Sequence, residues 1–104
     1  MRYEWDERKN LLNQWRHDGI SFELAVRAFD DERCLIYPDR IDEETGEDRW
    51  HALGAVPFGN GIDAILLVVH VYRENLYGEE IVRIISARAA SKHDIRRYQE
   101  QAVH

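Results

Sequence analysis

Residues Val82 to Tyr98 read VRIISARAASKHDIRRY, and this stretch joins a strand directly to a helix. The run from Ile81 to Ala87 is mostly apolar and has the length of a strand. Ser91 then stands where a helix N-cap is preferred, which predicts a C-terminal helix from there to about Gln101. The end of the chain therefore combines a strand of a sheet with a terminal helix.

The same stretch spaces basic residues along the strand and the helix. They are Arg83 and Arg88 at the strand and Lys92, Arg96 and Arg97 on the helix. A guanidinium presents its donors in a planar fork that matches phosphate oxygens, so such residues are suited to bind a phosphodiester. The alternative is a solvated surface on which they pair with Asp94, Glu79 or Glu80.

Two helices are predicted near the N-terminus. Asp6 is a candidate N-cap for a first helix that ends near His17. Its apolar stripe is expected to consist of Leu11, Leu12 and Trp15. Ser21 is a candidate cap for a second short helix, whose apolar residues follow at helical spacing.

Strands are predicted between these helices and the C-terminal helix. They are expected at residues 34–37, 49–56, 62–73 and 81–87, joined by connections of hairpin length, and a short β-like opening is expected at residues 3–5. Hairpins imply antiparallel pairing. We therefore predict an α+β fold with two N-terminal helices, an antiparallel sheet of about four strands and a C-terminal helix.

Length and composition predict one domain without a membrane segment. The chain has 104 residues, of which 44% are hydrophobic and 33% charged, so residues 1–104 are expected to form a single domain. The longest apolar run, residues 62–72, contains Asp63 and His70 and is about half of the roughly 20 residues needed to cross a bilayer. The N-terminus is too polar for a secretory signal and Cys34 has no partner cysteine, which favours the cytoplasm.

Charge is distributed unevenly along the chain. The net charge is −6, but residues 30–48 hold nine acids against Arg33 and Arg40, so the rest of the chain sums to +1. Twelve of the fourteen basic residues are arginine, which suits bidentate contacts with phosphate. The net charge therefore does not exclude a nucleic-acid partner. Residues 39–47, within the acidic stretch, are predicted to form an exposed hairpin loop.

Six ordered blocks of the sequence resemble the BrnT family of bacterial toxins. They are Trp5-Asp6-Glu7-x-Lys9-x-x-x-Asn13, His17, Ile20-Ser21-Phe22-Glu23-x-Ala25-x-x-x-Phe29-Asp30, Arg49-x-x-Ala52-Leu53-Gly54, Val69-His70-x-Tyr72-Arg73 and Arg83-Ile84-Ile85-Ser86-Ala87-Arg88-x-Ala90. The blocks cover nearly the whole chain in the expected order, which is more specific than any one of them.

The resemblance implies a RelE-like ribonuclease fold and toxicity through RNA cleavage and translation arrest. It also implies neutralisation by a BrnA-like antitoxin with a ribbon-helix-helix part. Operator DNA is then bound only through the toxin-antitoxin complex, which represses its own operon. An acidic loop at residues 39–47 is unusual for a protein that approaches RNA, so we expect this loop to face a partner or solvent, away from the substrate.

The candidate catalytic residues include cationic side chains of three strands that are expected to be neighbours. They are Arg49, Arg73, Arg83 and Arg88. RNA is cut without a metal when the ribose 2′-hydroxyl attacks the adjacent phosphorus, provided that side chains move the proton and stabilise the added charge. The guanidinium groups are predicted to converge on that phosphate. The alternative is structural pairing with Glu74, Glu79 or Asp6.

Further candidates lie on the first helix and in the strands. Lys9 is expected to hold phosphate or act as an acid, and Glu7 to serve as a charge partner or as a base. His17 and His70 are candidates for proton transfer, with His51 considered after them, because an imidazole titrates near about pH 6.5. A histidine in a strand is alternatively a packed side chain with a hydrogen-bond partner.

The sequence thus predicts a metal-independent endoribonuclease without a cofactor. Its five histidines and one cysteine do not fall at a recognised ligand spacing, and no glycine-rich phosphate loop is present. On the C-terminal helix, Lys92, Arg96 and Arg97 are candidates for RNA binding. The alternative is a non-catalytic binding module whose basic face holds an acidic protein partner or nucleic acid.

Overall fold

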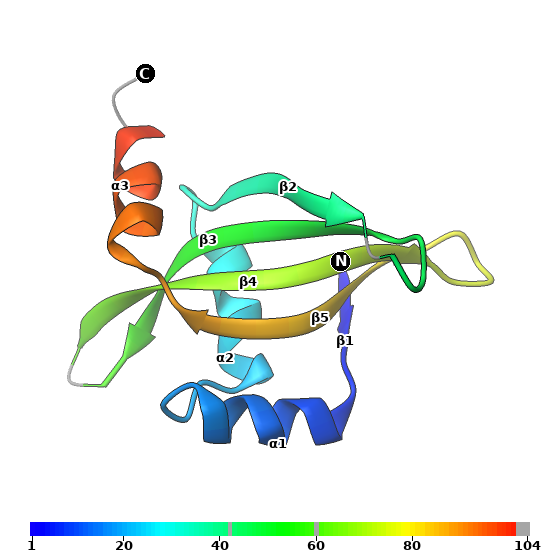
Figure 1. The fold of residues 1–104 in the computed structure, drawn as a ribbon, viewed down its shortest axis with the longest axis horizontal. Helices are drawn as coiled ribbons and strands as arrows, with labels where there is room; N and C mark the ends of the chain where they lie inside the picture. The colour runs from blue at the N-terminus through cyan, green and yellow to red at the C-terminus, as the bar shows by residue number, and fades with distance from the viewer. Residues whose placement is uncertain (42, 60, 102–104) are drawn as a thin grey trace.

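The computed structural model describes residues 1–41, 43–59 and 61–101, which form an α+β fold with one mixed sheet (Figure 1). In chain order the elements are β1 (Arg2–Glu4), α1 (Glu7–Arg16), α2 (Phe22–Val26), the 3₁₀ helix η1 (Arg27–Asp30), β2 (Leu35–Ile41), β3 (Asp48–Phe58), β4 (Ile62–Glu74), β5 (Glu80–Ala89) and α3 (Lys92–Glu100). Within the described ranges, none of the helices has both the length and the apolar character needed to span a membrane.

The sheet has five strands in the order β1-β5-β4-β3-β2. The strands β2 to β5 pair antiparallel through hairpin connections, as predicted. The prediction of about four antiparallel strands was incomplete, because the three-residue strand β1 joins the free edge of β5 in parallel. Nearly eighty residues separate β1 from β5, so no local hairpin or turn pattern in the sequence predicts this pairing.

The predicted helix starts are confirmed. Asp6 accepts hydrogen bonds from the first-turn amides of α1, Ser21 caps α2, and Ser91 forms a capping box with Asp94 at the start of α3. Each of these side chains satisfies backbone N–H groups that a helix cannot pair internally. Local sequence therefore fixes where each of these helices begins.

The apolar stripe expected on α1 does not face the core. Leu11 and Trp15 of the expected apolar stripe are 62% and 85% exposed, whereas the buried side chains of α1 are Asn10 and Asn13. Asn13 donates to the carbonyl of Ala87 at 2.8 Å and accepts from its amide at 3.1 Å. Helix α1 is thus held beside β5 (Figure 1). The side chain of Asn13 bonds to both backbone groups of Ala87, as a neighbouring strand would.

The hydrophobic core lies between α2 and one face of the sheet. Phe22 and Ala25 of α2 are fully buried with Val68 and Ile84 of the central strands. At Gly54 of β3, an added Cβ would lie 2.2 Å from the carbonyl oxygen of residue 28, so η1 approaches the strand too closely for any side chain. The helical layer is therefore packed directly onto the sheet.

On the opposite face of the sheet, α3 covers one end. Tyr98 of α3 packs with Leu53 and Leu67, and its hydroxyl donates to Asp31, a bond that contributes to raising the pKa of Tyr98 to about 12 after the larger effect of burial. Figure 1 shows α3 standing at one end of the sheet. We name this side of the sheet, which is opposite α2, the open face.

Candidate functional site

The arginines of β4 and β5 lie together on the open face. Side chains alternate along β4, so Arg73 points to the same side as Val71 and Leu67. The register places Arg83 directly opposite Val71 and Arg88 directly opposite Leu67. Residues directly opposite one another share a face of the sheet. The three arginines therefore share one face of the sheet, with Arg73 and Arg83 at one end and Arg88 opposite Leu67, four residues along β4 from Val71.

A bulge in β5 brings Arg83 and Arg88 to the same face. The two residues are five positions apart, so strict alternation would place them on opposite faces. The pairing with β4 shifts by one residue, because Ser86 and Ile84 pair with consecutive residues of β4 and Ile85 is left over. Such an extra residue re-aims the side chains that follow it.

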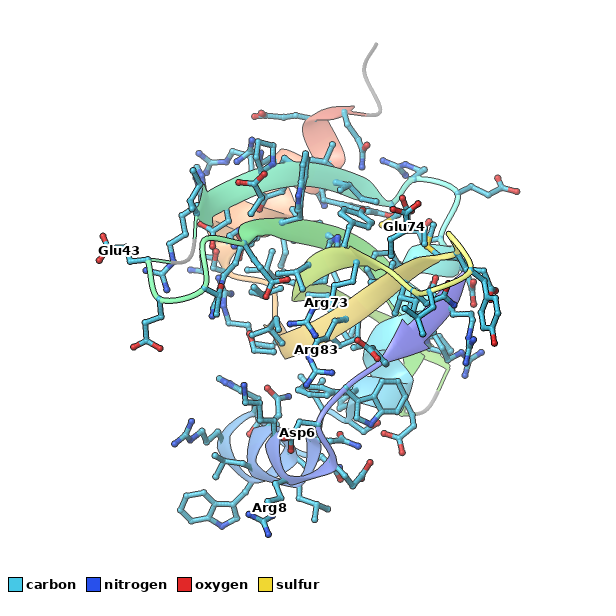
Figure 2. All side chains as sticks on the ribbon, turned by 90° about the vertical axis from the view of Figure 1, so that its right-hand side faces the viewer. Asp6, Arg8, Glu43, Arg73, Glu74 and Arg83 are labelled. Atoms are coloured by element: carbon cyan, nitrogen blue, oxygen red, sulfur yellow. The ribbon has the colours of Figure 1, made fainter. Side chains whose placement is uncertain are left out.

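Arg73 and Arg83 reach one and the same anionic oxygen. Their Nη1 atoms lie 3.8 and 3.5 Å from the Oε1 atom of Glu4 on β1. Figure 2 shows the two arginines side by side on the open face. Guanidinium groups spaced to share a carboxylate oxygen are also spaced to share an oxygen of a phosphate. Their side chains are 43% and 25% exposed, so a ligand from solvent can reach them.

The acidic segment folds back over this pair of arginines. Glu47 accepts from Nε and Nη2 of Arg73 at 3.1 and 2.9 Å, and this bidentate pair raises the pKa of Arg73. Residues 39–47 were expected to face a partner or solvent, whereas Glu47 contacts an arginine of the candidate site. Residues 39–41 continue β2, and residue 42 lies outside the described residues.

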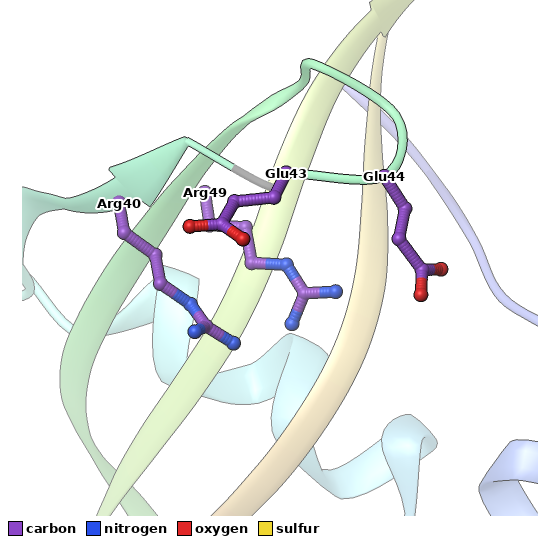
Figure 3. A pocket seen from close by; sticks show the side chains of 4 residues that line it. All are labelled: Arg40, Glu43, Glu44 and Arg49. Atoms are coloured by element: carbon purple, nitrogen blue, oxygen red, sulfur yellow. The ribbon is translucent and has the colours of Figure 1, made fainter.

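Arg49 lies on the same face, at the end of β3 nearest this acidic segment. It is four residues from Leu53, so alternation directs it to the open face. Arg49 and Arg40 line a cavity of about 330 Å³ together with Glu43 and Glu44. Figure 3 shows the two arginines extending in a similar direction from neighbouring strands, with Glu43 close to them. Arg40 of β2 and Arg49 of β3 thus lie near carboxylates, as Arg73 of β4 does.

His51 joins the arginines on the open face, although the sequence reasoning ranked it behind His70. It follows Arg49 by two residues in β3, and its partner in the register is Val69. Its Nε2 atom lies 3.2 Å from Oδ2 of Asp39 on the neighbouring strand β2. A carboxylate at one ring nitrogen orients an imidazole and leaves Nδ1 for proton transfer. Arg49 and His51 are two residues apart in a strand, and this spacing in the sequence predicts that both side chains lie on one face.

His70 lies on the other face of the sheet. It is fully buried, its ring packs 5.0 Å from the ring of Phe29, and its Nε2 atom lies 3.1 Å from the hydroxyl of Tyr72. Burial lowers the pKa of His70 to about 4. The structure thus separates His70 from the four arginines and surrounds it as a packed side chain.

The buried His70 predicts a loss of stability in mild acid. Its pKa is lower in the folded chain than in the unfolded chain, so its contribution is complete above about pH 6.5 and decreases as the pH falls toward 4. We expect the free energy of unfolding to drop by about 2 kcal/mol between pH 7.5 and pH 5. Urea unfolding at both pH values measures this drop. A His70→Gln variant should lose clearly less; an equal loss in the variant would contradict the assignment.

Lys9 and His17 lie apart from the arginine pair, in a cavity between α1 and β5. This cavity of about 270 Å³ is lined by Lys9, Leu12, Asn13, Arg16, His17, Ile85 and Ser86. Ser86 belongs to the open face, between Arg83 and Arg88 in the chain, so the cavity continues the cationic surface past the edge of β5. Arg16 is a cation of this cavity that the sequence reasoning did not consider.

Glu7 makes contacts that hold the N-terminal region together. Its carboxylate accepts from the indole of Trp5 and from the side-chain amide of Asn10, both at 3.1 Å. Asn10 in turn accepts from the amide of Phe22 at the start of α2. The structure therefore gives Glu7 a role in joining α1 to its surroundings, and does not place it beside the four arginines.

The candidate cations of α3 are exposed at the far end of the open face. Arg88 donates to Asp94 of α3 at 3.0 Å, which is one of the pairings expected for a structural role. The guanidinium of Arg97 lies 3.8 Å from the centre of the Tyr37 ring. Lys92 and Arg96 are exposed on the same helix. These side chains border the open face without converging on Arg73 and Arg83.

The chain was also compared with known proteins. A family model described as the ribonuclease toxin BrnT of type II toxin-antitoxin systems matches residues 5–94. This range contains β2 to β5 and all four arginines of the open face, and ends within α3. No curated protein matches the chain. Within the ranges that the structure describes, no group of three or more His, Cys, Asp or Glu side chains has the arrangement of a metal site.

Proposed function

The chain belongs to the BrnT family of ribonuclease toxins of type II toxin-antitoxin systems, and on this premise we propose that it cleaves RNA on the open face without a metal. The observation that carries the proposal is the oxygen of Glu4 shared by Arg73 and Arg83. It marks a position where two guanidinium groups stabilise one anionic oxygen. The scissile phosphate binds there, displacing the carboxylate.

The reaction is an internal transesterification. The ribose 2′-oxygen bonds to the adjacent phosphorus, the bond from phosphorus to the 5′-oxygen breaks, and the products carry a 2′,3′-cyclic phosphate and a 5′-hydroxyl. Arg73 and Arg83 stabilise the charge that develops on the phosphate oxygens, as preorganised donors do in other transfer reactions. His51, oriented by Asp39, accepts the 2′-hydroxyl proton, and the departing oxygen takes a proton from solvent.

The RNA continues from this centre in two directions. Toward α1, the cavity with Lys9, Arg16 and His17 accepts a flanking phosphate, because these groups share one hollow beside Ser86. Toward the other edge, Arg49 and the exposed cations of α3 approach the backbone. They are Lys92, Arg96 and Arg97. The contacts of His70 and Glu7 described above leave both outside this proposed site.

The biological setting follows from the family. A type II system pairs the toxin with a protein antitoxin, and we propose that this partner is a BrnA-like protein with a ribbon-helix-helix part. In this proposal the chain is a single domain with a RelE-like fold, acts in the cytoplasm and arrests translation by degrading RNA. The complex with the antitoxin represses the operon, and the toxin reaches operator DNA only through its partner.

Cleavage of single-stranded RNA by the purified chain in EDTA tests the proposal. The expected result is fragments with 2′,3′-cyclic phosphate ends and an unchanged rate when the metal is removed. Intact RNA at high protein concentration would favour a binding module that holds nucleic acid or an acidic protein without cutting it. Loss of cleavage on addition of EDTA, restored by a divalent cation, would contradict metal independence.

Glu47 is expected to compete with RNA for Arg73. Replacing it in Glu47→Gln removes the bidentate carboxylate while keeping the length of the side chain. We expect RNA to bind about fivefold more tightly, since a partly exposed ion pair is worth up to about 1 kcal/mol. Titration with a labelled 2′-O-methyl RNA measures the affinity.

A matched control separates this competition from a change in net charge. Glu32→Gln removes one negative charge from an exposed position between η1 and β2. It should bind RNA almost as the unmodified chain does. Equal tightening in both variants would show that Glu47 acts through overall charge and not through Arg73.

A further inference from the structure

The outer surface of α1 carries large apolar side chains in water. Leu11 and Trp15 are 62% and 85% exposed, and Leu12 beside them is 43% exposed. Trp15 lies four residues from Leu11 and three from Leu12, so its side chain neighbours both on the helix surface. Neither hydrophobic cluster of the core includes them. We name this surface, consisting of Leu11, Leu12 and Trp15, the α1 stripe.

The apolar residues of the stripe are not needed to hold α1 against the rest of the fold. The helix is fastened through its opposite side by Asn10 and Asn13, which bond to the backbone of residues 22, 20 and 87. A helix held by polar contacts needs no apolar residues on its solvent side. Contiguous exposed apolar side chains on a soluble protein mark a surface that another protein covers, and exposed tryptophan is typical of residues that dominate binding energy.

The rim of the stripe is positively charged. Arg8, Lys9 and Arg16 are all exposed on α1, and Figure 2 shows Arg8 on the side of the helix away from the sheet. The acid of this helix, Glu7, is bonded to Trp5 and Asn10. A second copy of the chain docked through its own stripe would bring like charges together. An apolar partner segment flanked by acids fits better.

We infer that the α1 stripe is the docking surface for an acidic amphipathic helix of the antitoxin. This inference rests on the proposed antitoxin partner. An amphipathic helix presents apolar anchors at the spacing of the stripe, and its flanking carboxylates pair with the cations of the rim. The stripe is separate from the arginine pair on the open face, so Leu11 and Trp15 can be changed without altering Arg73 or Arg83.

Docking on the stripe also explains how the toxin is silenced. Leu12 belongs to the stripe and to the cavity that holds Lys9, Arg16 and His17. A helix lying on α1 therefore stands at the mouth of this cavity and pairs with two of its cations. RNA loses its flanking phosphate contact while the antitoxin is bound. Neutralisation is then steric and electrostatic, without a change in the fold.

The test is a variant that truncates the two residues of the stripe that do not line the cavity. Leu11→Ala combined with Trp15→Ala is expected to weaken binding of the purified antitoxin, encoded by the neighbouring gene, on the order of 100-fold. RNA cleavage by the free variant should be unchanged, but the antitoxin should no longer suppress it. The matched control is Leu76→Ala with Tyr77→Ala, which removes side chains that are 100% and 88% exposed in the turn between β4 and β5. This control should bind the antitoxin normally.

A charge reversal tests the chemistry of the partner. Arg8→Glu places an acid on the rim and should weaken antitoxin binding about tenfold. Normal binding by the Leu11 and Trp15 variant would overturn the docking surface, and tighter binding by Arg8→Glu would overturn the acidic partner. If the unmodified chain does not bind the antitoxin, the proposed partner fails and the docking proposal fails with it. Cleavage of RNA, measured on the free chain, stands independently of that result.

Discussion

The Arg83→Ala variant is expected to cleave RNA on the order of 100- to 1,000-fold more slowly than the unmodified chain, because removal of one preorganised donor to a developing oxyanion has an effect of about that size. Arg83 and Arg73 contact the same oxygen of Glu4, so each is expected to contact the same oxygen of the phosphate. Single-turnover cleavage of a short labelled RNA measures the rate. The fold should persist, since a partly exposed ion pair contributes little stability.

Two further variants distinguish the role of the Arg83 guanidinium from the effect of positive charge alone. Arg83→Lys keeps the charge but loses the planar fork, so an intermediate rate is expected. Arg2→Ala removes an arginine from the same edge of the sheet, where its contact is Glu79 at 3.8 Å and not the shared oxygen. It should cleave RNA at nearly the normal rate. A similar loss in Arg2→Ala and Arg83→Ala would indicate that overall charge, and not the shared oxygen, determines activity.

The Asn13→Ala variant is expected to lose about 2 to 4 kcal/mol of stability. Its side chain satisfies both the amide and the carbonyl of Ala87 and donates to the carbonyl of Ile20, all in buried surroundings. Removing it leaves backbone groups of β5 without partners where water does not replace them. Urea unfolding followed by circular dichroism measures the loss.

A neighbouring residue on the same helix provides the comparison for Asn13. Gln14→Ala removes longer and partly exposed hydrogen bonds, to the backbone and side chain of Asn10 at 3.4 and 3.2 Å. We expect it to lose no more than about 1 kcal/mol. If Asn13→Ala were as stable as Gln14→Ala, the account of how α1 is fastened beside β5 would be incorrect.

Secondary structure and helix starts could be predicted because their signals are local. The caps Asp6, Ser21 and Ser91 and the hairpin-length connections each act within a few residues. The orientation of α1 could not be predicted from its apolar stripe. The spacing of apolar residues identifies an amphipathic helix but does not show whether its apolar side packs on the core or on another protein. In α1 the side that faces the rest of the fold carries the polar Asn13.

The composition of the site depends on the period and the register of the strands. His70 and Arg73 are three residues apart in β4, so alternation alone places them on opposite faces. The same rule places Arg49 and His51 together. Applied to β5, the rule would place Arg83 and Arg88 on opposite faces, because they are five residues apart. The bulge that brings them to one face has no clear sequence signal. Strand alternation could thus have selected His51 over His70 as the histidine that shares a face with the arginines. That Arg83 and Arg88 share this face could be learned only from the structure.

The acidic segment was placed wrongly for a related reason. The acidic composition of residues 39–47 suggested a loop that faces a partner or solvent, away from RNA. Charge composition does not reveal which opposite charges a loop meets after folding. Glu47 and Glu4 form ion pairs with Arg73 in the free chain, and we propose that a phosphate replaces them when RNA binds. A strongly acidic chain is therefore compatible with a cationic centre.

The most direct measurement is a structure of the chain with a short 2′-O-methyl RNA, in which the blocked 2′-oxygen cannot attack. The account predicts a phosphate oxygen within hydrogen-bond distance of both Arg73 and Arg83, at the position now held by Glu4, with Glu47 released from Arg73. The opposite result is RNA bound on another surface while Glu4 and Glu47 still hold these arginines. That result would contradict the assignment of the open face as the catalytic surface.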